Sequence, residues 1–285
     1  MRVATVACCL LAIVLAGSVW AEQIGGPSGP AEGQFNLSAE SIFRDNVHGR
    51  MTTPSMLDGV TQAGRPAARL LIGPGVEGCR SLSTETFYGV GEYGITDRLS
   101  LRGKLGVANL GLDMGPGDMY DFGYGLAWAA GLRYRICAPG KPGTSFAISG
   151  QFAHSEPDDF AIAGGLVAEG FKGFPFSERF SGAKLDEVNV ALAVGTTVNN
   201  TRPYAGIVWS HFDFDFNETI SVAAPFADVS ARTKLGSVRA FSFDKSSDVG
   251  AIVGLDQALG ESGRLNLEAR AFDEASFTAS LGFLW

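Results

Sequence analysis

Cysteine and histidine, which supply many metal sites and nucleophilic active sites, are scarce in this chain. Its 285 residues include four cysteines and three histidines, and Cys8 and Cys9 lie inside an apolar N-terminal stretch. The remaining pair, Cys79 and Cys137, is too few for a disulfide framework, although a disulfide could form in an oxidising compartment. No Cys/His spacing resembles a metal site, so we expect no metal and no other cofactor.

Basic residues and long apolar runs are also in short supply. Lys and Arg number 22 against 30 Asp and Glu, which gives a net charge of −8. The basic residues form no cluster, and this argues against nucleic acid as a partner. Beyond the N-terminal stretch, no segment approaches 18 consecutive apolar residues, so a helical membrane protein is excluded.

The N-terminus has the pattern of a secretory signal peptide. Arg2 is the only charged residue before Glu22, and residues 3–17 form an almost unbroken apolar run. The segment ends in Val19-Trp20-Ala21, with small or short residues at the positions that a signal peptidase reads. A membrane anchor is the alternative, but a spanning helix needs about 20 apolar residues and this run is shorter. We expect residues 1–21 to be removed by cleavage after Ala21.

The rest of the chain is rich in alternation with a period of two residues. Between Leu99 and Val107, mostly apolar residues at odd positions alternate with Ser100, Arg102 and Lys104. Similar alternation recurs at 120–136, 188–194, 249–255 and 264–271. Successive side chains of a strand point to opposite faces, so each segment predicts a strand with one apolar face and one polar or small face.

The lengths of the strands and of their connections favour a membrane barrel over a soluble β-sandwich. Alternation runs through all of 120–136, whereas globular strands usually have about 5–6 residues and a bilayer-crossing strand takes about 9–11. Tyr120 and Tyr134 lie near opposite ends of this apolar face, as girdles at two membrane interfaces would require. Short turns alternate with two long insertions, roughly 154–185 and 217–246, an arrangement typical of outer-membrane barrels.

Counting back from the C-terminus predicts nine strands. They lie near 276–285, 264–272, 247–257, 203–215, 186–198, 144–153, 119–136, 99–108 and 83–93. Bacterial single-chain barrels have an even number of strands, so one more must come first. Arg69–Glu77 is the preferred candidate and Gln34–Asn46 the other.

The predicted fold is therefore all-β: a closed antiparallel transmembrane β-barrel of about ten strands, with eight or twelve possible. Residues 22–65 would form an N-terminal periplasmic arm or plug, and residues 66–285 the barrel.

The C-terminal residues carry a resemblance to a known class. Alternate apolar positions lead through Leu281 and Phe283 to the terminal Trp285. This ending resembles the C-terminal assembly signal of Gram-negative outer-membrane barrels, which usually ends in Phe. Residues 92–104 are similar to a strand–turn–strand unit of small OmpA/OmpW-like or porin-like barrels. The resemblance implies export through the periplasm, insertion into the cell outer membrane by the barrel-assembly machinery, and contact with outer-membrane lipid and lipopolysaccharide. It implies no single activity.

If the apolar faces meet lipid, the opposite faces line the lumen, because a charged side chain is costly in hydrocarbon. The residues expected to line the lumen are Arg102, Lys104, Arg133, Arg135, His211, Asp213, Asp215, Asp256, Arg264, Glu268 and Arg270. They would either fill a narrow lumen with ion pairs or form a charged constriction that selects small solutes. Barrels of about eight strands are filled by side chains and those of 16–18 hold an aqueous channel, so ten lies nearer the filled end.

Two histidines offer alternative, enzymatic interpretations. His211 lies on one strand face with Asp213 and could act as a general base, as in outer-membrane proteases of the omptin type, but no second pair of carboxylates is convincingly opposite. His154-Ser155-Glu156 suggests a serine hydrolase. Adjacent strand residues point to opposite faces, however, so His154 and Ser155 could meet only where the strand has ended. We assign no catalytic residue.

The sequence thus predicts a structural surface protein of the cell envelope or a narrow porin-like passive channel, without enzymatic activity. The alternatives are an outer-membrane hydrolase with a site at the outer rim, and a surface adhesion or binding module built on the two long insertions. Small solutes are possible ligands, and nucleic acid is not expected.

Two geometric predictions test the strand directions. Cys79 and Cys137 should lie at opposite ends of the barrel and remain unbonded, because a disulfide requires Cα atoms within about 7 Å. In the last hairpin, Leu265, Leu267, Ala269, Ala271, Phe277, Ala279, Leu281 and Phe283 should face outward, and Arg264, Glu268, Arg270, Thr278 and Ser280 inward. The final strand should pair with the first one, because an open edge in lipid would leave backbone groups unsatisfied.

Overall fold

The computed structural model describes eleven stretches of the chain. They are residues 29–47, 49–52, 61–62, 65–66, 81–113, 119–136, 144–165, 175–223, 234–245, 248–272 and 274–285. The signal-peptide prediction and both cysteines of the disulfide prediction lie outside these residues. Within them, no helix has the length and apolar character needed to cross a membrane.

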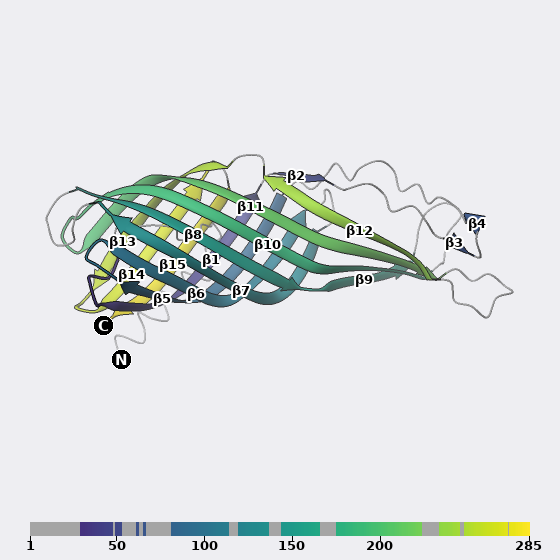
Figure 1. Cartoon of the computed structure of the whole chain (residues 1–285), viewed down its shortest axis with the longest axis horizontal. Helices are drawn as coiled ribbons and strands as arrows, with labels where there is room; N and C mark the ends of the chain where they lie inside the picture. The colour runs from purple at the N-terminus through teal and green to yellow at the C-terminus, as the bar shows by residue number, and fades with distance from the viewer. Residues whose placement is uncertain are drawn as a thin grey trace.

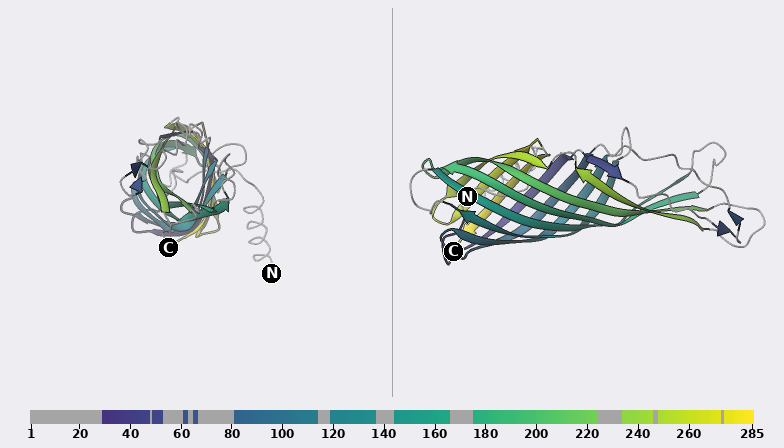
Figure 2. Two further views of the ribbon diagram at one scale, coloured as in Figure 1. Left: turned by 90° about the vertical axis from the view of Figure 1, so that its right-hand side faces the viewer. Right: turned by 45° about the horizontal axis from the view of Figure 1, so that its top comes forward.

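Ten strands close into an antiparallel barrel, which appears end-on as a ring in Figure 2. In ring order they are β1 (Phe35–Val47), β5 (Ser81–Gly94), β6 (Leu99–Asp113), β7 (Met119–Arg135), β8 (Thr144–Asp158), β10 (Pro175–Thr196), β11 (Thr201–Ala223), β13 (Val249–Leu259), β14 (Gly263–Ala271) and β15 (Ala275–Leu284). β1 pairs with β15 on one side and with β5 on the other. The predicted closure of the last strand on the first, and the ten-stranded barrel, are confirmed.

The preferred candidate for the first strand, Arg69–Glu77, is wrong, and the alternative, Gln34–Asn46, is confirmed. Phe35–Val47 fills the place for which Arg69–Glu77 was preferred, so the barrel begins well before residue 66 and the predicted domain boundary is also wrong. Residues 69–77 lie outside the described part of the chain. A long connection between β1 and β5 is permitted because the entropic cost of loop closure rises only slowly with length.

The two ends of the barrel differ. At one end, which we call the terminal end, the Phe35 N–H donates to the Trp285 carbonyl at 3.0 Å and the Trp285 N–H donates back at 2.9 Å. The connections 95–98, 197–200 and 260–262 are short and lie at this end. At the opposite, loop end, β10 and β11 run on beyond the barrel (Figure 1).

Further strands pair with these extensions of β10 and β11. β9 (Phe160–Gly165) pairs with β10, β12 (Lys234–Lys245) pairs with β11, and β2 (Gly49–Thr52) pairs with β12. A separate short pair is formed by β3 (Thr61–Gln62) and β4 (Arg65–Pro66). The sheet therefore projects from the barrel at the loop end.

The outer surface of the barrel changes character along its length. Toward the terminal end it exposes large apolar side chains, which we call the apolar belt: Leu37, Leu101, Leu105, Leu126, Leu132, Ile148, Val190, Leu192, Ile207, Val253 and Leu281. On six strands this surface passes within two or three residues to a charged or histidine side chain. The steps are Phe43 to Asp45, Phe87 to Glu85, Tyr124 to Asp121, Phe152 to His154, Val188 to Asp186 and Trp209 to His211. Five of the six apolar residues at the step are aromatic.

Aromatic residues also mark the other margin of the belt. Phe35, Tyr93, Tyr134, Phe146, Phe283 and Trp285 are exposed near the terminal end. We call the part of the barrel within the belt the terminal half and the part beyond it the loop half.

At the level where the outer surface passes from apolar to polar, the interior of the barrel becomes mainly apolar. The terminal half encloses charged and polar side chains together with two small apolar clusters, one around Val90 and one around Val208, whereas the loop half encloses a larger apolar cluster that we call the apolar plug. It consists of Val47, Leu82, Leu110, Leu112, Phe122, Phe180, Ala183, Leu185, Phe212, Phe214 and Phe216. Within it, the Phe122 ring meets the rings of Phe180, Phe214 and Phe216 at centroid distances of 5.9–6.3 Å.

Candidate functional site

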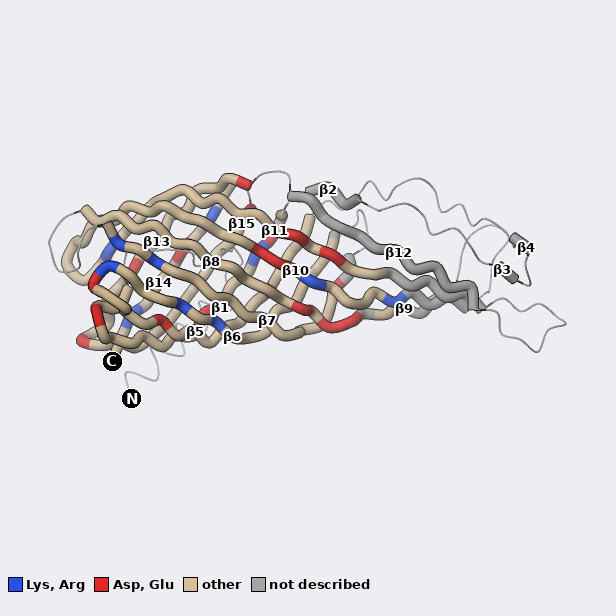
Figure 3. Tube along the Cα trace, in the orientation of Figure 1, with Lys and Arg blue, Asp and Glu red and all other residues tan. Residues whose placement is uncertain are grey.

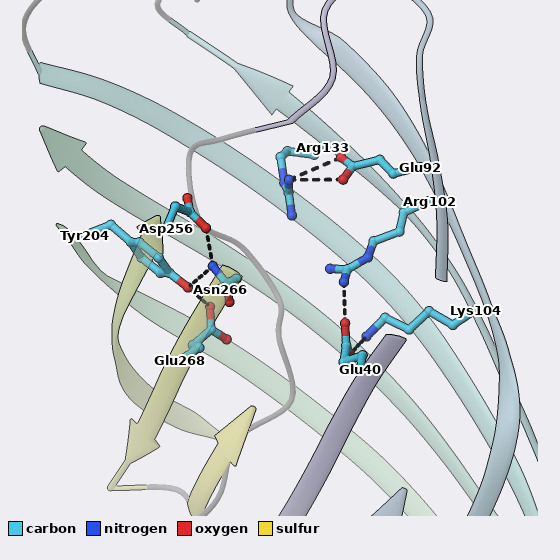
Figure 4. A network of polar contacts seen from close by, with 9 residues as sticks. All are labelled: Glu40, Glu92, Arg102, Lys104, Arg133, Tyr204, Asp256, Asn266 and Glu268. Carbon is cyan, nitrogen blue, oxygen red and sulfur yellow. Dashed lines mark hydrogen bonds and ion pairs between the residues drawn. The ribbon is translucent and has the colours of Figure 1, made fainter. Parts of the chain in front are cut away.

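The interior of the terminal half contains buried ion pairs contributed by distant strands (Figure 4). Glu40 on β1 accepts from Lys104 at 2.6 Å and from Arg102, both on β6. These three side chains are between 0 and 9 % exposed. The carboxylate thus balances part of the charge of two cations that are largely buried.

A second group lies nearer the terminal end. Arg133 on β7 pairs with Glu92 on β5 at 3.1 Å, and Ser100 donates to the same carboxylate at 2.6 Å. The neighbouring Arg135 donates to two backbone carbonyls, those of Gly29 at 2.7 Å and Pro30 at 2.6 Å. Residues that precede β1 therefore enter the barrel and contact its charged wall.

A third group joins β11 to β13 and β14. The Tyr204 hydroxyl donates to Glu268 at 2.7 Å and accepts from the Asn266 amide at 3.3 Å. The same amide donates to Asp256. Figure 4 shows this group facing the ion pairs of the opposite wall.

A fourth group lies on the side of the apolar plug. Arg44 pairs with Glu187 at 2.7 Å and with Glu274 at 3.3 Å. Arg270 shares Glu274 at 3.3 Å and donates to Ser210 at 2.5 Å. All four charged side chains are at most 4 % exposed. Removing one partner of such a pair strands a buried charge, which typically costs roughly 3–5 kcal/mol.

Two small cavities lie between the described side chains of the interior. One cavity of about 40 Å³ is lined by Glu92, Arg102, Arg133, Asp256 and Arg264, together with Gly29 and smaller polar residues. A second cavity of about 20 Å³ lies between Arg44, Tyr88 and Glu187. Each has room for ordered water, but neither is a passage for a solute.

The structure brings most of the predicted lumen residues together. Inside the barrel lie Arg102, Lys104, Arg133, Arg135, Asp256, Arg264, Glu268 and Arg270. In the C-terminal hairpin Thr278 and Ser280 also point inward, whereas Leu281 and Phe283 are exposed.

The prediction that His211, Asp213 and Asp215 line the lumen is wrong. The side chains of His211 and Asp213 are 52 % and 75 % exposed, and the three phenylalanines between and after them fill the apolar plug. The His211 ring also stacks on the outward-facing Trp209 at 6.2 Å. The strand continues beyond the apolar belt, and there its outer face is polar and its inner face is apolar. Figure 3 shows acidic residues on β10 and β11 in this region.

Several interior residues were missed by sequence reasoning. They are Glu40, Arg44, Glu92, Glu187, Tyr204, Asn266 and Glu274. A signal for some of them was present: Glu40 and Arg44 alternate with outward Ala39 and Phe43, and Glu187 precedes the exposed Val188. The pattern indicates the face of each residue but not which charges meet across the barrel.

The geometry does not support the hydrolase interpretations. His211 lies 3.7 Å from Asp213 and 3.8 Å from Asp248, too far for hydrogen bonds. His154 has a closer partner, Asp186, at 2.6 Å from Nδ1. Ser155, however, is buried on the inner face while His154 points outward against Trp128, so the two residues cannot act as nucleophile and base.

Among the described residues, no group of three or more His, Cys, Asp and Glu side chains is arranged to hold a metal ion.

Outside the barrel wall, Asp159 at the end of β8 accepts from Arg179 at 2.6 Å and from the Gly182 N–H at 3.1 Å. The hydrogen bond from Arg179 lowers the pKa of Asp159, with a smaller lowering from the Gly182 N–H.

Comparison with known proteins found no matching family model and no characterised protein with a matching sequence. Solved structures with a similar shape are outer-membrane β-barrels. The outer-membrane protease OmpT from Escherichia coli has a TM-score of 0.44 and 9 % identity, over 91 % of this chain and 97 % of that one. The outer-membrane protein OprG from Pseudomonas aeruginosa has a TM-score of 0.39 and 12 % identity, over 90 % and 98 %. The translocator domain of the autotransporter NalP from Neisseria meningitidis has a TM-score of 0.38 and 8 % identity, over 91 % and 90 %. None of these similarities assigns a function to the chain.

Proposed function

We propose that the protein is a structural surface protein that spans the bacterial outer membrane as a closed barrel. The apolar belt would face lipid, with the terminal end in the periplasm and the loop end outside the cell. Aromatic residues at both margins of the belt support this placement, because transmembrane barrels carry aromatic girdles at the two interfaces. Charged side chains inside the terminal half support it as well, since they avoid hydrocarbon there.

One observation carries the closed state: the charged groups around Glu40, Arg44 and Arg270 are paired and buried in the interior. Arg44, Glu40, Lys104 and Arg270 have side chains that are at most 3 % exposed, whereas the walls of a solute channel are in contact with water. The apolar plug adds a second barrier beyond them. Barrels of about eight strands are filled in this way, and the present ten-stranded barrel resembles them.

The proposed role of the barrel is to anchor the sheet that projects from the loop end. β10 and β11 continue from the wall of the barrel into this sheet without a break. Continuous strands would hold it at a fixed position relative to the membrane. Contact with lipopolysaccharide around the belt, and assembly through the outward-facing Leu281, Phe283 and Trp285, belong to the same proposal; these three side chains are 45–68 % exposed.

Planar-bilayer conductance tests the closed state. The full-length mature chain, refolded in lipid, should give no conductance steps, and a known porin in the same bilayer serves as the positive control. Regular ion steps from the unmodified chain would support the narrow channel instead. Recovery of the protein in the outer-membrane fraction, in a form whose gel mobility changes on heating, tests the placement separately.

A further inference from the structure

We propose that residues 29–33 are a removable stopper over an anion-binding vestibule at the terminal end of the barrel. The vestibule is the 40 Å³ cavity next to Arg133 and Arg264, together with the space that Gly29 and Pro30 occupy. Its ligands would be small carboxylates, phosphates or sulfonates. That the site binds anions without passing them on rests on the closed interior proposed above.

The stopper occupies a defined seat. Gly29 and Pro30 are buried inside the barrel. A Cβ atom on Gly29 would lie 3.1 Å from a Glu92 carboxylate oxygen and 3.4 Å from the Arg133 guanidinium, so a larger side chain would press on this ion pair and displace either the pair or the segment. The segment turns back into β1 through the hydrogen bond from Gly33 to the Gly94 carbonyl at 2.9 Å.

Two carbonyl oxygens of the stopper contact an arginine in the way that the two oxygens of a bound anion would. Arg135 donates from its two terminal nitrogens to two adjacent carbonyl oxygens, those of Gly29 and Pro30. A guanidinium fork matches a carboxylate or phosphate in the same two-point manner, and a charged oxygen pair binds it more strongly than neutral carbonyls do. A ligand of this class could therefore take the place of the stopper.

The charge around the seat is positive. Arg202 and Arg264 are within electrostatic reach of Arg133 and Arg135, and the carboxylates in this group are Glu92 and Asp256. Arg102 lines the same cavity and is paired with Glu40, so five positive and three negative groups leave a net charge of +2. Arg264 lines the cavity directly. A mouth of one charge sign concentrates ions of the opposite sign, so the vestibule should prefer anions.

The vestibule is closed at its other side. Beyond the Arg102–Glu40–Lys104 group and the buried pairs of Arg44 and Arg270 lies the apolar plug. Releasing the stopper would therefore admit an anion to a pocket that has no second exit. The predicted activity is binding, not conduction.

Thiol labelling tests the stopper and the charge preference together. Ser280 lines the cavity and is 7 % exposed, so Ser280→Cys, in a background with Cys79→Ser and Cys137→Ser, reports access. The probes are a sulfonate-bearing and a trimethylammonium-bearing methanethiosulfonate. Gly29→Leu unseats the stopper, and Glu32→Leu, at an exposed position of the same segment, is the matched control.

The thiol should be unreactive in the parent and in Glu32→Leu, and reactive in Gly29→Leu. The sulfonate reagent should react about tenfold faster than the cationic one, and inorganic phosphate should slow both. Equal labelling in the parent and Gly29→Leu would rule out the stopper, and faster labelling by the cationic reagent would rule out the anion site. Arg135→Lys, which keeps the charge but loses the fork, is a second opening variant in case Gly29→Leu does not fold; heat-dependent gel mobility verifies folding of each variant.

Discussion

Strand β11 allows the terminal half and the loop half to be compared within a few residues. Before Ser210 it exposes Ile207 and Trp209 and buries the polar Tyr204 hydroxyl in the interior. After Ser210 it exposes His211 and buries Phe212. The backbone pairing is regular across this point, and the strand pairs with β10 on both sides of it.

In the proposed membrane placement, the medium outside the wall determines the pattern of both faces. Where the outside is apolar, charges are placed in the interior and must find partners there, because an unpaired buried charge is costly. Where the outside is polar, the interior can be packed like the core of a soluble protein. The same two-residue alternation therefore places polar residues inward in the terminal half and apolar residues inward in the loop half.

The largest effect is expected from breaking the shared ion pair of the terminal half. Glu40→Ala leaves Arg102 and Lys104 buried without their common carboxylate, and this should lower the free energy of unfolding by about 3–5 kcal/mol. Urea unfolding in lipid vesicles measures it. The triple variant Glu40→Leu, Arg102→Met and Lys104→Met removes all three charges and should recover most of the loss. A single variant as stable as the parent would show that the interior is hydrated.

In the loop half, removing side-chain volume from the interior should lower the free energy of unfolding. Phe214 is fully buried in the apolar plug, so Phe214→Ala should cost about 3–5 kcal/mol in the same unfolding assay. The matched control is its exposed neighbour, Asp215→Ala, with an expected change within about 0.5 kcal/mol. Comparable effects at the two positions would contradict a packed core in this half.

An arginine placed on the outer surface should lower stability in the terminal half but not in the loop half. Leu105 is 64 % exposed within the apolar belt, and Leu105→Arg should cost about 2–4 kcal/mol if that surface meets lipid. Asp213→Arg, outward in the loop half, should change stability by no more than about 0.5 kcal/mol. The proposed membrane position fails if the first substitution is as well tolerated as the second.

A small pH effect is expected at the surface of the loop half. The pKa of Asp159 is lowered mainly by the hydrogen bond from Arg179, so this carboxylate contributes stability above its unfolded pKa of about 3.9. The contribution is lost as the pH falls through the lower folded pKa. Because the pair is exposed, its contribution should be below about 1 kcal/mol. In Arg179→Gln, most of this loss of stability at acid pH should disappear, as measured by the free energy of unfolding against pH. If the acid part of that curve is unchanged, Asp159 does not contribute to it.

Much of the fold could be predicted from the sequence because strand alternation is local. The interior positions of Arg102, Lys104 and Glu268 follow from their neighbours, since one-residue slips would expose whole charged faces. The first strand was harder, because Phe35–Val47 places Glu40 and Arg44 inward and its alternation is less clear than that of the later strands.

The position of His211 could not be predicted in the same way. The alternation of exposed and buried residues in β11 does not break at Ser210; in the proposed placement only the surrounding medium changes there, and a sequence does not state where a membrane ends. The partners of the interior charges were also out of reach, because Arg44 and Glu187 come from strands far apart in the chain.

The most direct test of the account is the depth of outward positions along β11. Ile207→Cys and Asp213→Cys, in a background without Cys79 and Cys137, can each carry a nitroxide label in reconstituted vesicles. The label at 207 should collide with oxygen dissolved in the lipid and be shielded from a water-soluble nickel chelate, and the label at 213 should show the reverse. Equal exposure of both labels to the nickel chelate would contradict a lipid boundary between Trp209 and His211, and with it the membrane placement of the barrel.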